Sequence, residues 1–306
     1  MHLDNFDLNL LVGIDALMRH KSVTAAAQEL HITQSAMSSA LKRARRHFAD
    51  EILYYDGQHM VPTPFGRDLQ ALVPEMIASL RALSRMRAQG SIERVERQFT
   101  IIASDYVAAV YIAALSRQLA RVAPGLSLAV LPFTQEALRR FHAGSIDFLI
   151  APKSATIEGE ADLLFEDGFR CVLWRDNPAL SAGLTADAYL SASHILTNFF
   201  LEEGKSHFER WLADNGHSVR IVASLPSFVL LPHYVSGTTR VATIHQRLEP
   251  HFEAHKDLVF VDTPLPVPPL QEYLVTNRIQ RHDTEAMLLR SIMHEVAAEL
   301  PPRTVN

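Results

Sequence analysis

Between Ser22 and Phe48 the apolar positions recur at helical spacing over two short segments separated by a break. The first segment predicts a helix with Ser22 as N-cap and an inward face of Val23, Ala26, Ala27 and Leu30. After the break at 31–33, Thr33 is placed to cap a second helix with the apolar stripe Ala36, Met37, Ala40, Leu41 and Ala44. Small alanines at buried positions let two helices cross closely at a steep angle, as a helix-turn-helix requires.

The polar face of the second helix changes in character along its length. Short polar side chains stand at its start and cations at its end: Gln34, Ser35, Ser38, Ser39, Lys42, Arg43, Arg45 and Arg46. This division suits a helix in the major groove of DNA, where the first turns reach base edges and the later cations meet phosphates. Taken alone, the pattern fits equally well an amphipathic hairpin whose charged face is only solvated.

Two flanking patterns complete a small domain. The apolar spacing of 6–20 predicts a helix that packs behind the pair. After Phe48, the β-like pieces 52–55 and 60–61 flank the turn signal Asp56-Gly57, which indicates a β-wing.

A long amphipathic helix is predicted to follow, from Thr63 and Pro64 to about Gln89. Pro74 lies inside it and is expected to bend it without necessarily ending it. We expect its stripe to pair with a second copy of the chain. The residues assigned to this dimer seam are Leu69, Leu72, Met76, Leu80 and Leu83. The alternative is that the stripe packs on the C-terminal portion of the same chain.

From Gln98 onward strands and helices alternate. The βαβαβ order of the first part predicts a parallel sheet with helices on its faces. A second alternating set follows, and it includes a predicted helix at 227–235. The chain is expected to cross between these two α/β halves twice, near Phe165 and near 266–269.

The helix-turn-helix stretch resembles the LysR-type transcriptional regulators. The matching positions are Ala26-Ala27, Leu30, Thr33-Gln34, Ala36, Ser38, Leu41 and Arg43. Asp7-Leu8-Asn9-Leu10-Leu11 and Pro62-Thr63-Pro64 resemble the branch that contains nodulation and aromatic-catabolism regulators. An arginine common in the wing of this family, where it touches the DNA backbone, corresponds to Tyr55, and a usual glycine corresponds to His59, so the sequence departs from the family where the wing would contact phosphate.

The resemblance implies three parts: a winged helix-turn-helix over 1–63, a linker and dimerisation helix over 64–90, and an effector-binding domain over 91–306. The last part resembles type II periplasmic-binding proteins, with lobe I at about 91–164 and 269–306 and lobe II at about 165–268. The implied partners are promoter DNA, a small-molecule effector, a second copy in a dimer or dimer of dimers, and RNA polymerase as a candidate. The implied DNA contacts are Thr33, Gln34, Ser35, Ser38, Lys42, Arg43, Arg45 and Arg46.

The effector is expected between the two lobes, where strands hand over to helices. The candidate residues are Ser104, Asp105, Phe133, Thr134, Thr197, Asn198, Phe199, Ser227 and Phe228. Each polar one could equally be an ordinary helix cap. The phenylalanines favour a small aromatic effector. No lysine or arginine occurs among these residues, which argues against a phosphorylated or multiply charged metabolite, and Asp105 would repel an anion or require a hydroxyl donor from the ligand.

Composition and missing motifs narrow the remaining classes. The net charge of -5 over 306 residues argues against non-specific DNA binding by the whole surface, although four cations cluster within 42–46. The single cysteine, Cys171, excludes an intramolecular disulfide framework and fits the cytoplasm. No GxSxG, Walker or GxGxxG motif occurs. His251 and His255 have a metal-compatible helical spacing, but no cysteine or third histidine nearby completes a ligand set, so no catalytic residue, metal or cofactor is assigned. The rival readings are a transporter's solute-binding protein and, less favoured, an α/β enzyme.

Overall fold

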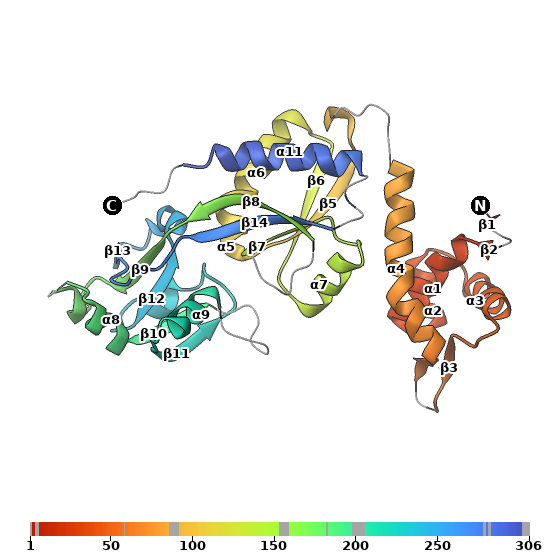
Figure 1. Ribbon diagram of the computed structural model, residues 1–306, viewed down its shortest axis with the longest axis horizontal. Coiled ribbons are helices and arrows are strands. Elements are labelled where there is room, and N and C mark those ends of the chain that lie inside the picture. The colour runs from red at the N-terminus through yellow and green to blue at the C-terminus, as the bar shows by residue number, and fades with distance from the viewer. Residues whose placement is uncertain are drawn as a thin grey trace. The chain divides into compact units, whose positions relative to one another are not determined.

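The computed structural model describes residues 2–3, 6–57, 59–85, 92–152, 159–181, 183–197, 206–277, 280 and 283–301. The chain divides into two compact units, Met1–Met86 with His142–Ser145 and Arg87–Phe141 with Ile146–Asn306. Figure 1 labels most of the helices and strands of both units. No helix among the described residues is long and apolar enough to cross a membrane.

The first unit is helical and carries one β-hairpin. Its elements are β1 (His2–Leu3), β2 (Phe6–Asp7), α1 (Asn9–His20), α2 (Val23–Glu29), α3 (Gln34–Phe48), β3 (Leu53–Tyr55), β4 (Met60–Pro62) and α4 (Pro64–Arg85). Both predicted caps are present: the Ser22 hydroxyl accepts from the amide of Ala25 at 3.3 Å, and that of Thr33 from Ala36 at 3.1 Å. Ala26, Ala27 and Met37 are buried where α1, α2 and α3 meet.

Helix α4 packs one face into the core of this first unit. Leu69, Val73 and Ile77 are buried there, and Leu80 is partly buried against the same cluster. Pro74 lies within the helix without ending it, as expected. The apolar stripe of α4 is therefore shared between its own unit and solvent.

The first lobe of the second unit holds a five-stranded sheet of order β6-β5-β7-β14-β8. Its strands are β5 (Arg97–Ile102), β6 (Leu126–Leu131), β7 (Phe148–Pro152), β8 (Glu160–Asp167) and β14 (Leu270–Thr276). Strands β6, β5 and β7 are parallel as predicted, but β14 runs antiparallel to both β7 and β8. The sheet is therefore mixed, because β14 belongs to a chain that returns from the other lobe.

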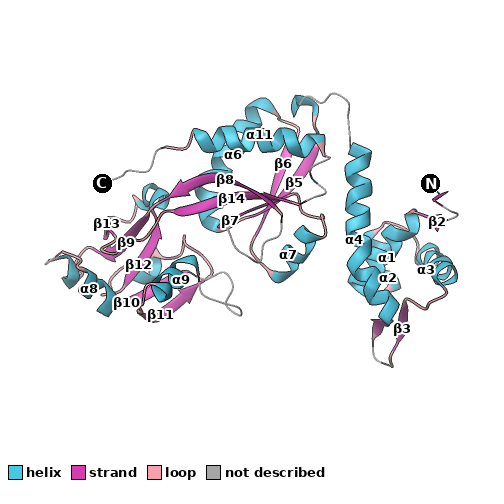
Figure 2. Ribbon diagram, viewed as in Figure 1, coloured by secondary structure: helices cyan, strands magenta, loops and turns pink. Residues whose placement is uncertain are grey.

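Helices cover both faces of this sheet (Figure 2). They are η1 (Ile92–Arg94), α5 (Asp105–Val107), η2 (Ala108–Ile112), α6 (Ala113–Val122), α7 (Gln135–His142) and α11 (Thr284–Ala298). Residues of α6 and α11 share one apolar core with Leu270 and Leu274 of β14, whereas α7 packs with Val275 in a separate cluster.

The second lobe has its own five-stranded sheet, of order β11-β10-β12-β9-β13. Its strands are β9 (Phe169–Trp174), β10 (Ser193–Thr197), β11 (Arg220–Leu225), β12 (Val241–His245) and β13 (Leu258–Asp262). Its helices are η3 (Pro178–Leu180), α8 (Ala186–Ser191), α9 (His207–Asp214), α10 (Pro232–Val235) and η4 (Gln246–Phe252). The helix predicted at 227–235 is wrong in its extent, because turns occupy the segment until α10 begins at Pro232.

Two chain crossings join the lobes, as the sequence predicted. Strand β8 continues through Gly168 into β9, and the chain returns from β13 to β14.

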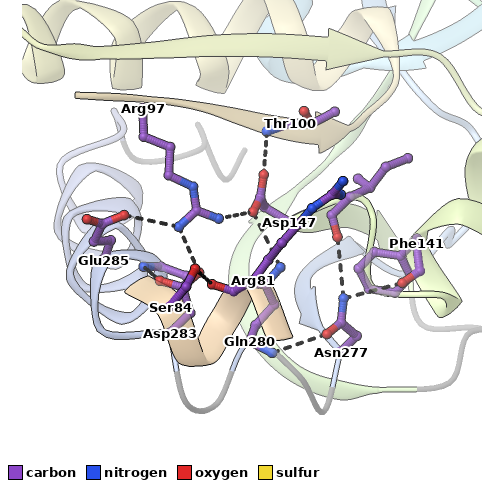
Figure 3. A network of polar contacts seen from close by, with 12 residues as sticks. Arg81, Ser84, Arg97, Thr100, Phe141, Asp147, Asn277, Gln280, Asp283 and Glu285 are labelled. Carbon is purple, nitrogen blue, oxygen red and sulfur yellow. Dashed lines mark hydrogen bonds and ion pairs between the residues drawn. The ribbon is translucent and has the colours of Figure 1, made fainter. Parts of the chain in front are cut away.

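A polar network in the first lobe surrounds Arg97, which ion-pairs with Asp147, Asp283 and Glu285 (Figure 3). Asp147 also accepts from the amide of Thr100 at 2.8 Å. This aspartate therefore ties the loop before β7 to β5, which is a structural role.

Candidate functional site

Helix α3 exposes the polar face that the sequence assigned to DNA. Met37, Leu41 and Ala44 turn into the core. The exposed residues are Gln34, Ser35, Ser38, Ser39, Lys42, Arg43 and Arg46. Thr33 is exposed too, but its hydroxyl caps α3 and lies 3.0 Å from that of Ser35. The short polar side chains therefore lie on the first two turns of α3, and the exposed cations lie on its later turns.

Arg45 differs from the other cations of α3, since it is half-buried and its guanidinium bonds to the segment that follows the helix. Its Nε donates to the carbonyl of Glu51 at 2.8 Å and its Nη2 to the carbonyl of Leu53 at 2.6 Å. The Glu51 carboxylate lies 3.1 Å from Nε as well. The sequence did not reveal this arrangement, because a helical wheel cannot show which cation meets the next turn.

The five residues assigned to the dimer seam do not share one surface. Leu72, Met76 and Leu83 are 58%, 48% and 63% exposed. Leu69 is buried in its own unit, and Leu80 packs against the same core. The apolar spacing of a helix marks both faces alike, so the sequence merged an intradomain face with the adjoining exposed row.

Two of the predicted effector-site hydroxyls act as helix caps. Ser104 accepts from the amide of Val107 at 3.2 Å, and Thr134 accepts from that of Ala137 at 3.0 Å. Thr197 differs: it is 6% exposed, and its Oγ1 has no hydrogen-bond partner within the described part of the chain. Asn198 and Phe199 lie outside the described residues.

Asp105 bonds the first lobe to the second. Its Oδ2 accepts from the hydroxyl of Ser227 at 2.6 Å and from the amide of Val229 at 3.1 Å. The structure thus brings Asp105 and Ser227 together, but each satisfies the other. An incoming polar ligand would have to replace this interlobe contact or bind beside it.

Four rings gather at the same junction: Tyr106, Phe169, Phe228 and His245. The Tyr106 and His245 rings have centroids 4.0 Å apart, and His245 lies 4.6 Å from Phe228 and 5.1 Å from Phe169. We call this group the interlobe rings. Only Phe228 was predicted, whereas Phe133 packs with the cluster beneath α7. His245 was missed because it closes β12 and reads as an ordinary strand residue.

Two buried carboxyl groups underlie the interlobe rings. Asp167 is fully buried and accepts from the Tyr106 hydroxyl at 2.6 Å and from the amides of Gly168 and Arg247 at 2.8 and 3.2 Å. Burial raises the pKa of Asp167, and these bonds oppose the rise. Burial, reinforced by the charge of Asp167, raises the pKa of Glu272 to about 8. Glu272 is therefore largely protonated near neutral pH.

A helix-turn-helix with an exposed polar and cationic helix, on a chain that also carries a two-lobed α/β ligand-binding fold, defines a DNA-binding transcriptional regulator that responds to a small molecule. A family model described as bacterial regulatory helix-turn-helix protein, lysR family, matches residues 8–67, and one described as LysR substrate binding domain matches residues 93–298. The chain belongs to the LysR family of transcriptional regulators and is not an enzyme.

Relatives of similar length agree with this placement. Nodulation protein D 2 of Rhizobium tropici is 32% identical over 304 residues, which cover 99% of this chain and 97% of that protein. Nodulation protein D 1 of Rhizobium meliloti (strain 1021) is 32% identical over 306 residues, covering 99% of each chain.

Solved structures share the fold. A probable transcriptional regulator from Pseudomonas aeruginosa is 28% identical with a TM-score of 0.65, covering 94% of this chain and 97% of that chain. Full-length OxyR from the same organism is 17% identical with a TM-score of 0.71, covering 96% of this chain and 95% of that chain.

Within the described residues, no group of three His, Cys, Asp or Glu side chains could hold a metal ion.

Proposed function

We propose that this regulator acts in the cytoplasm as a homodimer, or a dimer of dimers, that reads paired promoter half-sites through α3. Gln34, Ser35 and Ser38 would meet base edges, and Lys42, Arg43 and Arg46 would meet phosphates. The observation that carries this proposal is the exposure of these side chains on the face of α3 opposite Met37, Leu41 and Ala44. RNA polymerase is proposed as a further partner once the protein is bound at a promoter.

Replacing Arg43 by alanine is expected to weaken binding to every duplex sequence and to lower the slope of log K against log salt by about 0.9. Arg43 is exposed on α3, and no hydrogen bond or ion pair to it occurs among the described residues. Ser38→Ala should instead relax base preference at a single position. The measurement is a salt titration on a duplex that the protein selects from a random library. An unchanged slope for Arg43→Ala would show that α3 does not lie in the major groove as proposed.

We further propose that the effector is a small aromatic molecule bearing a hydroxyl group and held between the lobes. The interlobe rings would supply ring contacts. Asp105 accepts hydroxyl and amide donors and would repel a carboxylate or phosphate at the same place. Thr197 would offer a buried hydroxyl that has no hydrogen-bond partner among the described residues.

Phe228→Ala is expected to abolish the effector response while leaving dimerisation and DNA binding intact, because Phe228 contacts Tyr106 and His245 between the lobes. Val229→Ala is the matched control, since the Val229 side chain is 42% exposed and its bond to Asp105 uses the backbone amide. A thermal-shift screen of hydroxylated aromatic compounds identifies the ligand, and footprinting measures the response. An unchanged response of Phe228→Ala would exclude the interlobe rings from the site.

A further inference from the structure

The turn between α3 and the hairpin is strained and firmly held. Ile52 has φ of 65°, a left-handed conformation that a β-branched residue rarely adopts, and it is only 1% exposed. Asp50 Oδ1 accepts from the Ile52 amide at 2.6 Å and from the Thr63 hydroxyl at 2.7 Å. The Thr63 amide donates to the Ile52 carbonyl at 3.0 Å. Such strain persists only where several contacts fix the backbone, and here they fix the start of the hairpin.

Arg45 supplies a direct bond between α3 and the same segment. Its two bonds to the carbonyls of Glu51 and Leu53 use donors on both Nε and Nη2. Its charge lies beside the carboxylate of Glu51, which is 66% exposed. A guanidinium with this geometry holds the first hairpin strand at one position relative to α3, and its charge is already balanced by Glu51.

The hairpin itself offers no lysine or arginine to DNA. We call residues Leu53–Pro62 the wing; the sequence contains no Lys or Arg between His47 and Gly66. Instead the wing exposes two large side chains, Tyr54 at 47% and Tyr55 at 65%. Its tip is closed by Asp56, whose amide donates to the His59 carbonyl at 3.0 Å and whose Oδ1 accepts from the His59 amide at 2.8 Å. Tyrosine hydroxyls are among the uncharged groups that bond DNA phosphates.

We propose that the wing docks on the DNA backbone through the hydroxyls of Tyr54 and Tyr55, and that Arg45 is the positioning residue that fixes the wing against α3. The proposal rests on the placement of α3 in the major groove argued above. It assigns Arg45 away from the phosphates, although its neighbours Lys42, Arg43 and Arg46 stay there. The wing then contributes affinity that depends little on salt, because a neutral donor releases no counterion.

Salt titrations of the full chain on a duplex selected from a random library distinguish the two roles of a cation. Lys42→Gln, the matched control, should lower the slope of log K against log salt by about 0.9, as expected for a lost phosphate contact. Arg45→Gln should leave the slope unchanged, because Arg45 contacts no phosphate, and glutamine can still hold the wing by donating to one carbonyl. If both variants lower the slope equally, Arg45 contacts phosphate and the proposal fails. If Lys42→Gln leaves the slope unchanged, the placement of α3 fails instead.

The hydroxyl contact has a separate test on the same duplex. Tyr55→Phe and Tyr54→Phe should each weaken binding about two- to tenfold with an unchanged salt slope, since each removes one neutral hydrogen bond. Tyr55→Arg should tighten binding and steepen the slope by about 0.9. If both phenylalanine variants bind like the parent chain, the hydroxyls do not contact phosphate and the proposal is overturned.

A hydroxyl-radical footprint tests the positioning role directly. Arg45→Ala should lose protection at the flanks of the site, where the wing lies, and keep protection where α3 lies. Arg45→Gln should restore the flanks. A uniform loss of protection across the whole site in Arg45→Ala, in a protein with parental circular dichroism, would contradict the positioning role.

Discussion

The Glu272→Gln variant is expected to be more stable than the parent chain, by an amount that grows as the pH rises. Glu272 lies on β14 between Leu270 and Leu274, on the face that α6 and α11 cover, and it is 3% exposed. Its Oε2 has no hydrogen-bond partner among the described residues. A carboxyl group in this setting is costly in its charged form, and glutamine matches its shape without being able to ionise.

The direction of the pH dependence follows from the raised pKa. Because burial raises the pKa of Glu272 to about 8, above its ordinary value of 4.5, the folded protein binds this proton more tightly than the unfolded chain does. The resulting stability is fully present below the unfolded value and is lost as the pH rises toward the folded value. Between about pH 5 and pH 8 the free energy of unfolding of the parent should fall relative to Glu272→Gln by about 3 kcal/mol.

Tryptophan fluorescence during urea unfolding makes this measurement on the full chain. The chain has two tryptophans, and both belong to the second lobe: Trp174 on β9 and Trp211 on α9. The signal therefore reports the unit that contains Glu272. Glu166→Gln is the control, because Glu166 lies on β8 at the surface, where it bonds Gln271. A stability difference that stays constant from pH 5 to pH 8 would show that Glu272 is not held protonated by burial.

Local pattern was sufficient to predict most of the first unit. The caps at Ser22 and Thr33 and the breaks between helices depend on neighbouring residues only, so the sequence carries them directly. The alternation of strands and helices in the βαβ part is also a local pattern, and it indicated the parallel pairing of β5 with β6 and β7. The direction of β14 was not predictable in this way, because it depends on where a returning strand pairs.

The effector site was less predictable, because its residues were chosen as ends of separate elements. Ser104 and Thr134 fit that description, yet each hydroxyl caps its own helix. The contacts that join the lobes involve residues far apart in the sequence, such as Asp105 with Ser227. No local signal identifies such a partner. His245 shows the same limit, since its ring meets Tyr106 only after both lobes have folded.

Arg45 and the α4 seam show a third limit, which concerns surfaces. Sequence spacing placed the seam residues along one apolar stripe, but which part of a stripe is buried depends on the neighbour that covers it. Leu69 and Leu80 meet the core of their own unit, and Arg45 meets the wing. The remaining exposed row, Leu72, Met76 and Leu83, is the part of the predicted seam still available to a second chain.

Met76→Glu is expected to prevent dimerisation and, with it, tight operator binding. Met76 is 48% exposed in the single chain and lies between Leu72 and Leu83 in the exposed row, so a carboxylate there would be buried in each chain of a dimer. An unpaired buried charge costs several kcal/mol, which is comparable to the free energy with which two such helices associate. Leu80→Glu would be ambiguous, because Leu80 also packs against its own unit.

The matched control is Gln70→Glu, which places the same charge on an exposed position of α4 away from the Leu72, Met76 and Leu83 row. Sedimentation velocity should show a monomer for Met76→Glu and a parental dimer for Gln70→Glu. Operator affinity should fall in Met76→Glu only, because two separate monomers then bind the two half-sites without being joined to each other. A Met76→Glu protein that stays dimeric and binds DNA like the parent would show that the exposed row of α4 is not the seam, because a partner helix packed on this row could not tolerate the charge.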